Sequence, residues 1–237
     1  MKKIFAYVLV ASVLCGCSAE QTDYRTILES SLAAVNELPK DTANHTKDYY
    51  AYYLPPDVGR VSGDETGNTF DWNGTKFVMN LNIAGILEKN EKSGDDLSDE
   101  PLFDPDKALY TLNGMYKDAT GFEHDFDVMV ADLKDGYACY MHTDYADYFA
   151  IADLLTAVKL PAKMLRIARS IRVDQQLVVQ DFSKESKITY TSRKIELFQN
   201  LAPENGTIDE LLIDGSNSIG QGPDDVKKRG NSDEISK

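Results

Sequence analysis

The stretch that decides the fold runs over residues 108–143 and reads ALYTLNGMYKDATGFEHDFDVMVADLKDGYACYMHT. Two turn signals, Ala-Thr-Gly and Asp-Gly, divide it into β-prone runs over 108–117, 122–133 and 137–143. Strands joined by turns this short pair antiparallel. The stretch therefore predicts a three-stranded antiparallel meander.

More strands are expected on both sides of this meander. An Asn-Gly pair at 73–74 lies between two runs of alternating apolar residues, so residues 68–82 predict a β-hairpin. The remaining β-prone runs, which are also expected as strands, are 46–54, 177–182 and 187–191.

Apolar residues recur at helical spacing in several other places. The first predicted helix covers 23–38, with a Thr-x-x-Glu capping box that begins at Thr26. Three further helices are expected to begin at Tyr145, Pro161 and Ser192, and a short last helix is expected to begin at Thr207. The sequence thus contains both strands and helices, in separate runs along the chain.

Separate runs of strands and helices are typical of the α+β class. We expect an antiparallel sheet of about six to eight strands, with helices packed on one face and an N-terminal amphipathic helix. Residues 23–213 are predicted to form a single domain. Residues 214–237 are polar and nearly free of aliphatic side chains, so they are expected to be a disordered tail.

Composition limits the class of protein further. The chain has 237 residues, of which 42% are hydrophobic, which is enough for one packed core or two small ones. The net charge is −14, from 39 acidic and 25 basic residues. Because phosphate groups would be repelled, this balance argues against nucleic acid as a partner.

The N-terminus has the layout of an export signal. Lys2 and Lys3 are followed by an apolar run over 4–14, which is too short to be a permanent membrane span. The run ends in Leu14-Cys15-Gly16-Cys17. This order of basic, apolar and small residues before a cysteine resembles the lipobox of bacterial lipoproteins.

The resemblance implies that a diacylglyceryl group is attached to the thiol of Cys17 and that the chain is cleaved before this residue. Residues 1–16 would then be a signal peptide, and residues 17–22 a tether that holds the domain near the membrane. Two or three acyl chains anchor a protein stably. The expected location is the extracytoplasmic face of the cell membrane.

Loss of Cys15 and lipidation of Cys17 would leave Cys139 as the only free thiol, so no intrachain disulfide could form. Many exported domains depend on disulfides. The absence of disulfides favours a Gram-positive envelope. In a Gram-negative cell, the expected location would be the outer membrane.

No motif for catalysis, metal binding or a cofactor stands out, and none of these is predicted. Cys139 and His142 are three residues apart on a strand, so they point to opposite faces and form no local dyad. Alternation places Glu123, Asp125 and Asp127 together on one strand face, where a solvated outer surface is expected rather than a metal site. Cys139 is expected to be buried among apolar neighbours.

Aromatic residues are most concentrated around residues 49–53. Tyr50 and Tyr52 should point to one side of a strand, and Tyr49 and Tyr53 to the other. One pair is expected in the core, and the other could be exposed. An exposed pair, together with Trp72, would suit a protein partner or a glycan.

Three functional hypotheses follow. The first is a non-enzymatic, lipid-anchored envelope lipoprotein that binds a protein partner or assists an assembly in the envelope. The alternative is a glycan-binding or small-ligand-binding module that uses residues 49–53 and Trp72. The third, an envelope hydrolase, requires carboxylates that converge in space.

Overall fold

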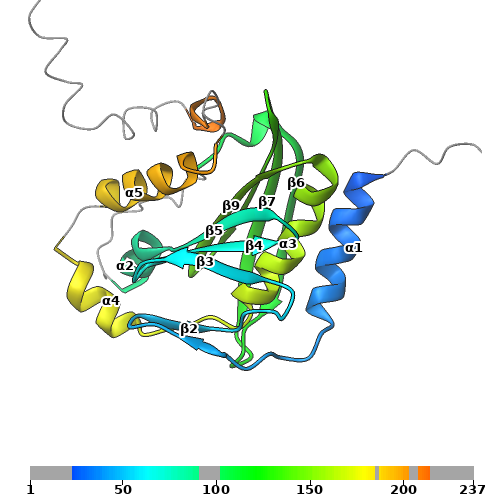
Figure 1. The fold of residues 1–237 in the computed structure, drawn as a ribbon. Coiled ribbons are helices and arrows are strands. Elements are labelled where there is room, and N and C mark those ends of the chain that lie inside the picture. The colour runs from blue at the N-terminus through cyan, green and yellow to red at the C-terminus, as the bar shows by residue number, and fades with distance from the viewer. Residues whose placement is uncertain (1–22, 91–101, 185–186, 203–207, 214–237) are drawn as a thin grey trace, which may run out of the picture.

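The computed structural model describes residues 23–90, 102–184, 187–202 and 208–213. Within these ranges a large antiparallel sheet has seven strands in the order β3-β4-β5-β9-β8-β7-β6 (Figure 1). The bounds of its strands are β3 Gly59–Gly63, β4 Gly67–Trp72, β5 Thr75–Leu81, β6 Ala108–Lys117, β7 Glu123–Leu133, β8 Gly136–Thr143 and β9 Ala146–Ala152. The predicted α+β class with an antiparallel sheet is confirmed.

The predicted meander is confirmed as β6, β7 and β8, which pair in sequence order. The predicted hairpin is confirmed as β4 and β5, with Trp72 opposite Thr75. Its turn is formed by Asn73 and Gly74, whose φ angles are 54° and 85°. These left-handed conformations explain why the turn uses an Asn-Gly pair.

A small antiparallel sheet lies beside the large one. Among the described residues it has three strands in the order β1-β2-β10, with bounds His45–Thr46, Tyr50–Tyr52 and Arg172–Val173. The strand predicted over 46–54 is therefore shorter in the structure, and it pairs away from the large sheet.

The helices are α1 Tyr24–Asn36, α2 Ile83–Asn90, α3 Leu154–Ala168, α4 Gln175–Phe182 and α5 Lys187–Gln199, with short 3-10 helices at Pro105–Lys107 and Asp209–Leu211. The cap of α1 is Asp23, whose carboxylate accepts hydrogen bonds from the backbone N–H groups of Arg25 and Thr26. The helix therefore begins before the predicted capping box.

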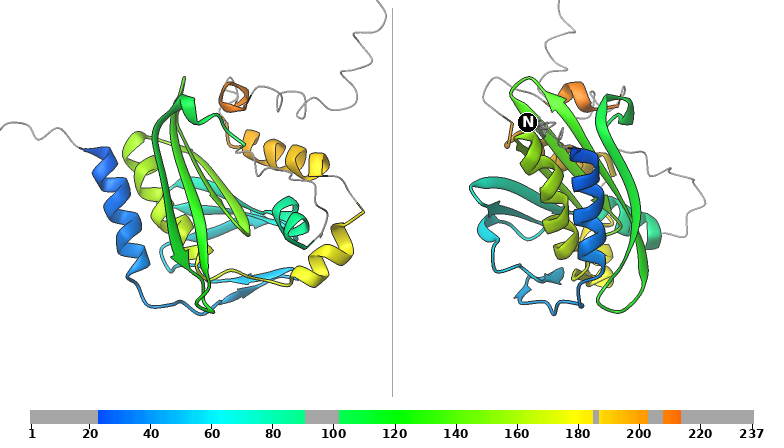
Figure 2. Two further views of the ribbon diagram at one scale, coloured as in Figure 1. Left: turned by 180° about the vertical axis from the view of Figure 1, so that it is seen from behind. Right: turned by 90° about the vertical axis from the view of Figure 1, so that its right-hand side faces the viewer.

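Helices cover both faces of the large sheet. α1 and α3 lie side by side on one face, and α5 lies on the other (Figure 2). The first face forms the larger core around Met79, Tyr148 and Leu165, and the second forms a smaller core around Phe149 and Phe198. The helices are therefore not confined to one face as predicted, because α5, which contains the helix expected from Ser192, packs on the other face.

Four predicted elements of secondary structure are wrong. The segment that begins at Tyr145 is strand β9 and not a helix, and Pro161 lies inside α3 instead of starting a helix. The two strands predicted over 177–182 and 187–191 are parts of α4 and α5. Strand β9 is buried on both faces, so its apolar residues do not alternate with polar ones.

Candidate functional site

The tyrosines of segment 49–53 lie mostly in the core. Tyr50 and Tyr52 belong to β2 and are buried, and Tyr49 is buried as well. The hydroxyl of Tyr50 accepts a hydrogen bond of 2.7 Å from the side-chain amide of Asn68. The Tyr49 hydroxyl donates to Asp181 at 3.1 Å. Tyr50 and Tyr52 thus lie in the larger core, and α4 covers Tyr49.

Tyr53 and Trp72 are only partly buried, and both are in contact with basic residues of α3. The guanidinium of Arg166 lies 5.1 Å from the centre of the Tyr53 ring, and Lys163 Nζ lies 5.4 Å from that of Trp72. The indole N–H also donates to Asp57. Segment 49–53 therefore presents no exposed tyrosine pair, and the expectation of one is wrong because α4 covers Tyr49.

A buried ionic cluster surrounds Asp147 on β9. Its carboxylate is fully buried, with Oδ1 2.7 Å from both the Tyr140 hydroxyl and His142 Nδ1. Its Oδ2 accepts a hydrogen bond of 2.8 Å from Lys194 of α5. Burial alone would raise the pKa of Asp147, but Lys194 and His142 hold this pKa well below its usual range.

A second cluster surrounds His124 of β7, which contacts Asp144 in the β8–β9 turn. His124 Nδ1 lies 2.7 Å from Asp144, and Nε2 lies 3.2 Å from Asp118. Each ring nitrogen of His124 thus faces a carboxylate. Burial would raise the pKa of Asp144, but hydrogen bonds from His124 and Lys89 lower it.

These two clusters bring together carboxylate and histidine side chains from different elements of the fold. His142 and Asp147 pair across β8 and β9, which sequence reasoning missed because β9 was predicted as a helix. Among the described residues, no group of three or more His, Cys, Asp or Glu side chains is arranged to hold a metal ion. Each carboxylate is instead directed at a neighbouring basic or hydroxyl side chain.

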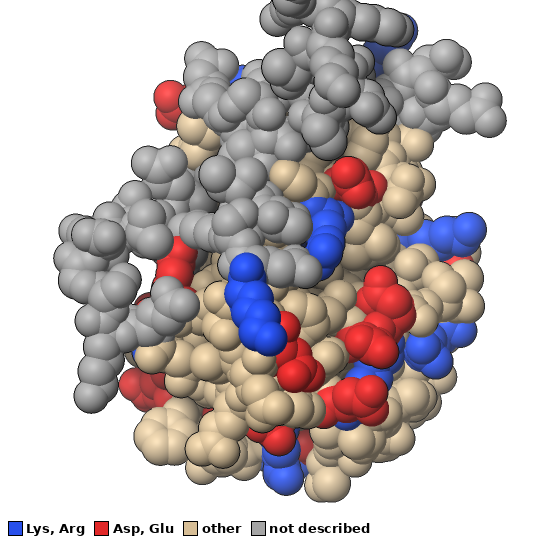
Figure 3. Space-filling view, turned by 90° about the vertical axis from the view of Figure 1, so that its left-hand side faces the viewer, with Lys and Arg blue, Asp and Glu red and all other residues tan. Residues whose placement is uncertain are grey.

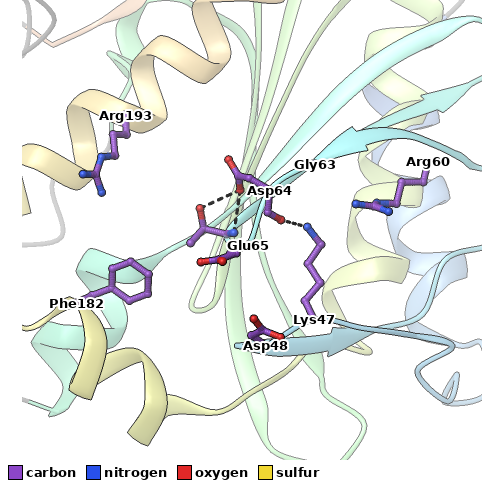
Figure 4. Close-up of a pocket in the computed structure, with 9 residues that line it drawn as sticks. Lys47, Asp48, Arg60, Gly63, Asp64, Glu65, Phe182 and Arg193 are labelled. Carbon is purple, nitrogen blue, oxygen red and sulfur yellow. Dashed lines mark hydrogen bonds between the residues drawn. The ribbon is translucent and has the colours of Figure 1, made fainter.

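A cleft of about 710 Å³ surrounds the β3–β4 turn. Arg60 and Arg193 lie on opposite sides of this turn, and Lys47 reaches toward it (Figure 4). Lys47 Nζ donates to the backbone oxygens of Asp64 and Gly67. The full lining is Lys47, Asp48, Arg60, Gly63, Asp64, Glu65, Thr66, Phe182 and Arg193.

The charges of this cleft balance, with as many acidic as basic residues in its lining. Figure 3, which shows the side of the molecule that carries α2, α4 and α5, has acidic and basic side chains next to one another. The Asp64 carboxylate accepts hydrogen bonds from the backbone of Thr66 and Gly67, so it stabilises the turn. Neither ionic cluster contributes a residue to the lining of this cleft.

The β6–β7 hairpin carries the most exposed apolar side chains. Leu109 is 47% exposed, Met115 is 55% exposed and Phe122 is 73% exposed. The other large apolar residues that are exposed among the described ranges are Leu38 after α1, Val61 on β3 and Leu155 on α3. The hairpin also exposes the predicted row of Glu123, Asp125 and Asp127. Apolar and acidic side chains are thus both exposed on this hairpin, and Met115 lies opposite Asp125 in its register.

The predicted lipidation site, Cys17, lies outside the described residues, as do the signal peptide, the tether, Thr207 and the tail. Within the described ranges, no helix combines the length and the apolar character needed to cross a membrane. No family model, curated protein or solved structure matches this chain.

Proposed function

We propose that this chain is a lipid-anchored envelope lipoprotein whose folded domain binds a protein partner without catalysing a reaction. The anchor is the lipobox cysteine, Cys17, at the end of the apolar N-terminal run. The binding surface is the outer face of the β6–β7 hairpin.

One observation carries the binding role: Leu109, Met115 and Phe122 are exposed on the same hairpin. Exposed apolar side chains that gather on one element, with polar neighbours around them, are typical of sites where a protein interacts. The neighbours here are the acidic residues of β7, which would select a partner by charge. The cluster around His124 includes Asp118 of the β6–β7 turn, so it stabilises this hairpin.

The experiment is site-specific photo-crosslinking in the native envelope. A photoreactive residue at Met115 should crosslink to one discrete protein of the envelope. The matched control position is Val61 on β3, which is 52% exposed and lies at the opposite end of the large sheet. Equal crosslinking from both positions, or none from Met115, would contradict the proposed binding role.

The anchor is tested separately by Cys17→Ala. Because the thiol of Cys17 would carry the lipid, the variant should leave the membrane fraction or stay uncleaved. The checks are membrane fractionation and the intact mass of the chain. Unchanged partitioning with an unchanged mass would exclude lipidation at this residue.

A further inference from the structure

Strand β6 has one edge that no strand covers within the described residues. The other edge pairs with β7, and the backbone N–H of Asp118 donates to Phe122 O at the end of this ladder. Alternation along an antiparallel ladder then directs the backbone groups of every second residue away from β7. These outward residues are Thr111, Asn113, Met115 and Lys117.

One contact confirms this direction. The side-chain amide of Asn36, at the end of α1, donates a hydrogen bond of 3.0 Å to the backbone oxygen of Met115. Among the described residues, no backbone group bonds to the outward side of β6. Apart from the Met115 carbonyl, which accepts from Asn36, the outward N–H and C=O groups of residues 111–117 are therefore available to pair with another chain.

The opposite end of the sheet is protected in the way that natural edge strands usually are. Strand β3 is five residues long, contains two glycines and has an irregular register between Arg60 and Ser62. Strand β6 is ten residues long, and its own irregularity falls at its start, between Ala108 and Tyr110. Residues 111–117 thus form a regular edge.

The side chains beside this edge are acidic. On the outer face, Lys117 pairs with Glu123 at 3.3 Å, and Asn113 donates to Asp127. Asp125 lies opposite Met115 in the register, and its carboxylate has no partner among the described residues. The middle of the outer face therefore presents an unneutralised carboxylate beside an exposed methionine.

We propose that the free edge of β6 binds an extended basic segment of the partner protein as an added strand. This inference rests on the proposed function and names the mode of binding and the chemistry of the partner. Main-chain hydrogen bonds would supply the affinity, and alternate side chains the specificity.

Strand spacing explains the basic character of the segment. Neighbouring strands lie about 4.8 Å apart, so β7 would lie about 10 Å from the added strand. A Lys or Arg on the outer face of the added strand spans this distance across Met115 and reaches Asp125. A second copy of this chain is a poorer occupant, since each copy has a net charge of −14.

The experiment uses the purified full chain in detergent and two synthetic eight-residue peptides. One alternates Lys with Val, and the other alternates Glu with Val. The basic peptide should slow hydrogen exchange at the amides of Thr111, Asn113, Met115 and Lys117 by at least about tenfold at saturation. The acidic peptide should leave these amides unchanged.

Two variants locate the binding. Thr111→Pro removes an outward N–H without removing a bond to β7, and it should weaken binding of the basic peptide at least about tenfold. Its matched control is Val61→Pro, on the exposed irregular part of β3. Asp125→Asn should weaken binding several-fold, whereas Asp135→Asn, an exposed acid in the β7–β8 turn, should not.

Three outcomes would overturn the inference: protection by the basic peptide elsewhere than on β6, equal binding of the acidic peptide, and a chain that dimerises through β6. If Thr111→Pro does not fold, the Asp125→Asn result decides. If a partner crosslinks through Met115 and still binds the Thr111→Pro and Asp125→Asn variants, that result would support the proposed function but contradict strand addition. Peptide protection of β6 without any crosslinked partner would contradict only the proposed function.

Discussion

Asp147 is a fully buried carboxylate whose charge depends on three neighbours. Tyr140 and His142 come from the adjacent strand, and Lys194 comes from α5. A charge in the core is tolerated only when it is paired and hydrogen-bonded. The cluster therefore fixes α5 on the sheet at one specific point.

The variant Asp147→Asn should lower the free energy of unfolding by about 3–5 kcal/mol at pH 7, since Lys194 would lose its buried partner. The pKa of Asp147 is lowered in the folded state, so its contribution is complete above the unfolded value of about 3.9 and is lost as the pH falls below it. Urea unfolding between pH 7 and pH 3 measures this. The variant should lose less stability than the wild type over the acidic part of that range.

Exposed Asp135 provides the control, because Asp135→Asn should change the unfolding free energy by less than about 0.5 kcal/mol. An Asp147→Asn chain with wild-type stability at pH 7 would show that the cluster does not hold α5.

The burial of Cys139 could be predicted from the alternation of side chains along its strand. It lies on β8 between Tyr137 and Met141, and its side chain is fully buried in the larger core. Burial raises the pKa of its thiol, so the reactive thiolate is scarce at neutral pH.

Alkylation of Cys139 should therefore be slow in the folded protein and fast in concentrated urea. Mass spectrometry of the peptide that contains Cys139 measures the two rates. Labelling that is equally fast without urea would mean that the core opens around β8.

At the scale of elements, α3 begins at a well-formed cap. The carboxylate of Asp153 accepts from the backbone N–H of Thr156 at 3.1 Å and from its hydroxyl at 2.7 Å. The helix then packs Val158, Leu165 and Ile167 into the core. In the sequence, Asp153 is the signal for the start of this helix. Pro161, the predicted start, lies in the third turn.

The variant Asp153→Ala should destabilise the protein by about 1 kcal/mol, because the first turn of α3 would lose its capping acceptor. Asp153→Ser keeps an acceptor and should recover most of that loss. Urea unfolding of the two variants side by side gives the comparison. Equal losses for Ala and Ser would show that the charge of Asp153, and not its capping bond, is what matters.

The alternation of polar and apolar residues predicted the strands that have one buried face and one exposed face. In β7, acidic residues alternate with Phe126 and Val128, so the strand and its buried face could both be predicted. Strand β9 lacks that alternation because both of its faces are covered. Helices α4 and α5 contain β-prone residues, and their packing against other elements overrides that preference. For α4 the cap Asp174 was the available signal.

The candidate surface was only partly visible in the sequence. The acidic row of β7 followed from period-two alternation, whereas the open edge of β6 depends on which strand ends the sheet. Strand order is set by contacts between distant residues, which alternation does not reveal. The burial of Tyr49 likewise depends on α4, which packs against it through Phe182.

At the scale of the whole molecule, the two proposed features act together. A short tether at Cys17 would confine the domain to a thin layer above the membrane, which raises the effective concentration of any partner anchored in the same layer. The net charge of −14 repels anionic lipid, so the domain would face away from the bilayer. A basic partner segment would be attracted to the domain by the same charge.

The strand order of the large sheet also has a consequence for how the chain folds. Every neighbouring pair in the sheet is consecutive in the sequence except β5 and β9, which are separated by the whole β6–β8 meander. Closing that loop costs chain entropy before any contact is gained, so we expect this step to limit the folding rate.

Val78→Ala on β5 should then slow refolding, whereas Val128→Ala on β7 should mainly speed unfolding, in stopped-flow measurements. Until β5 meets β9, the chain would exist as a three-stranded unit and a four-stranded unit, each with exposed strand edges that could pair with other chains.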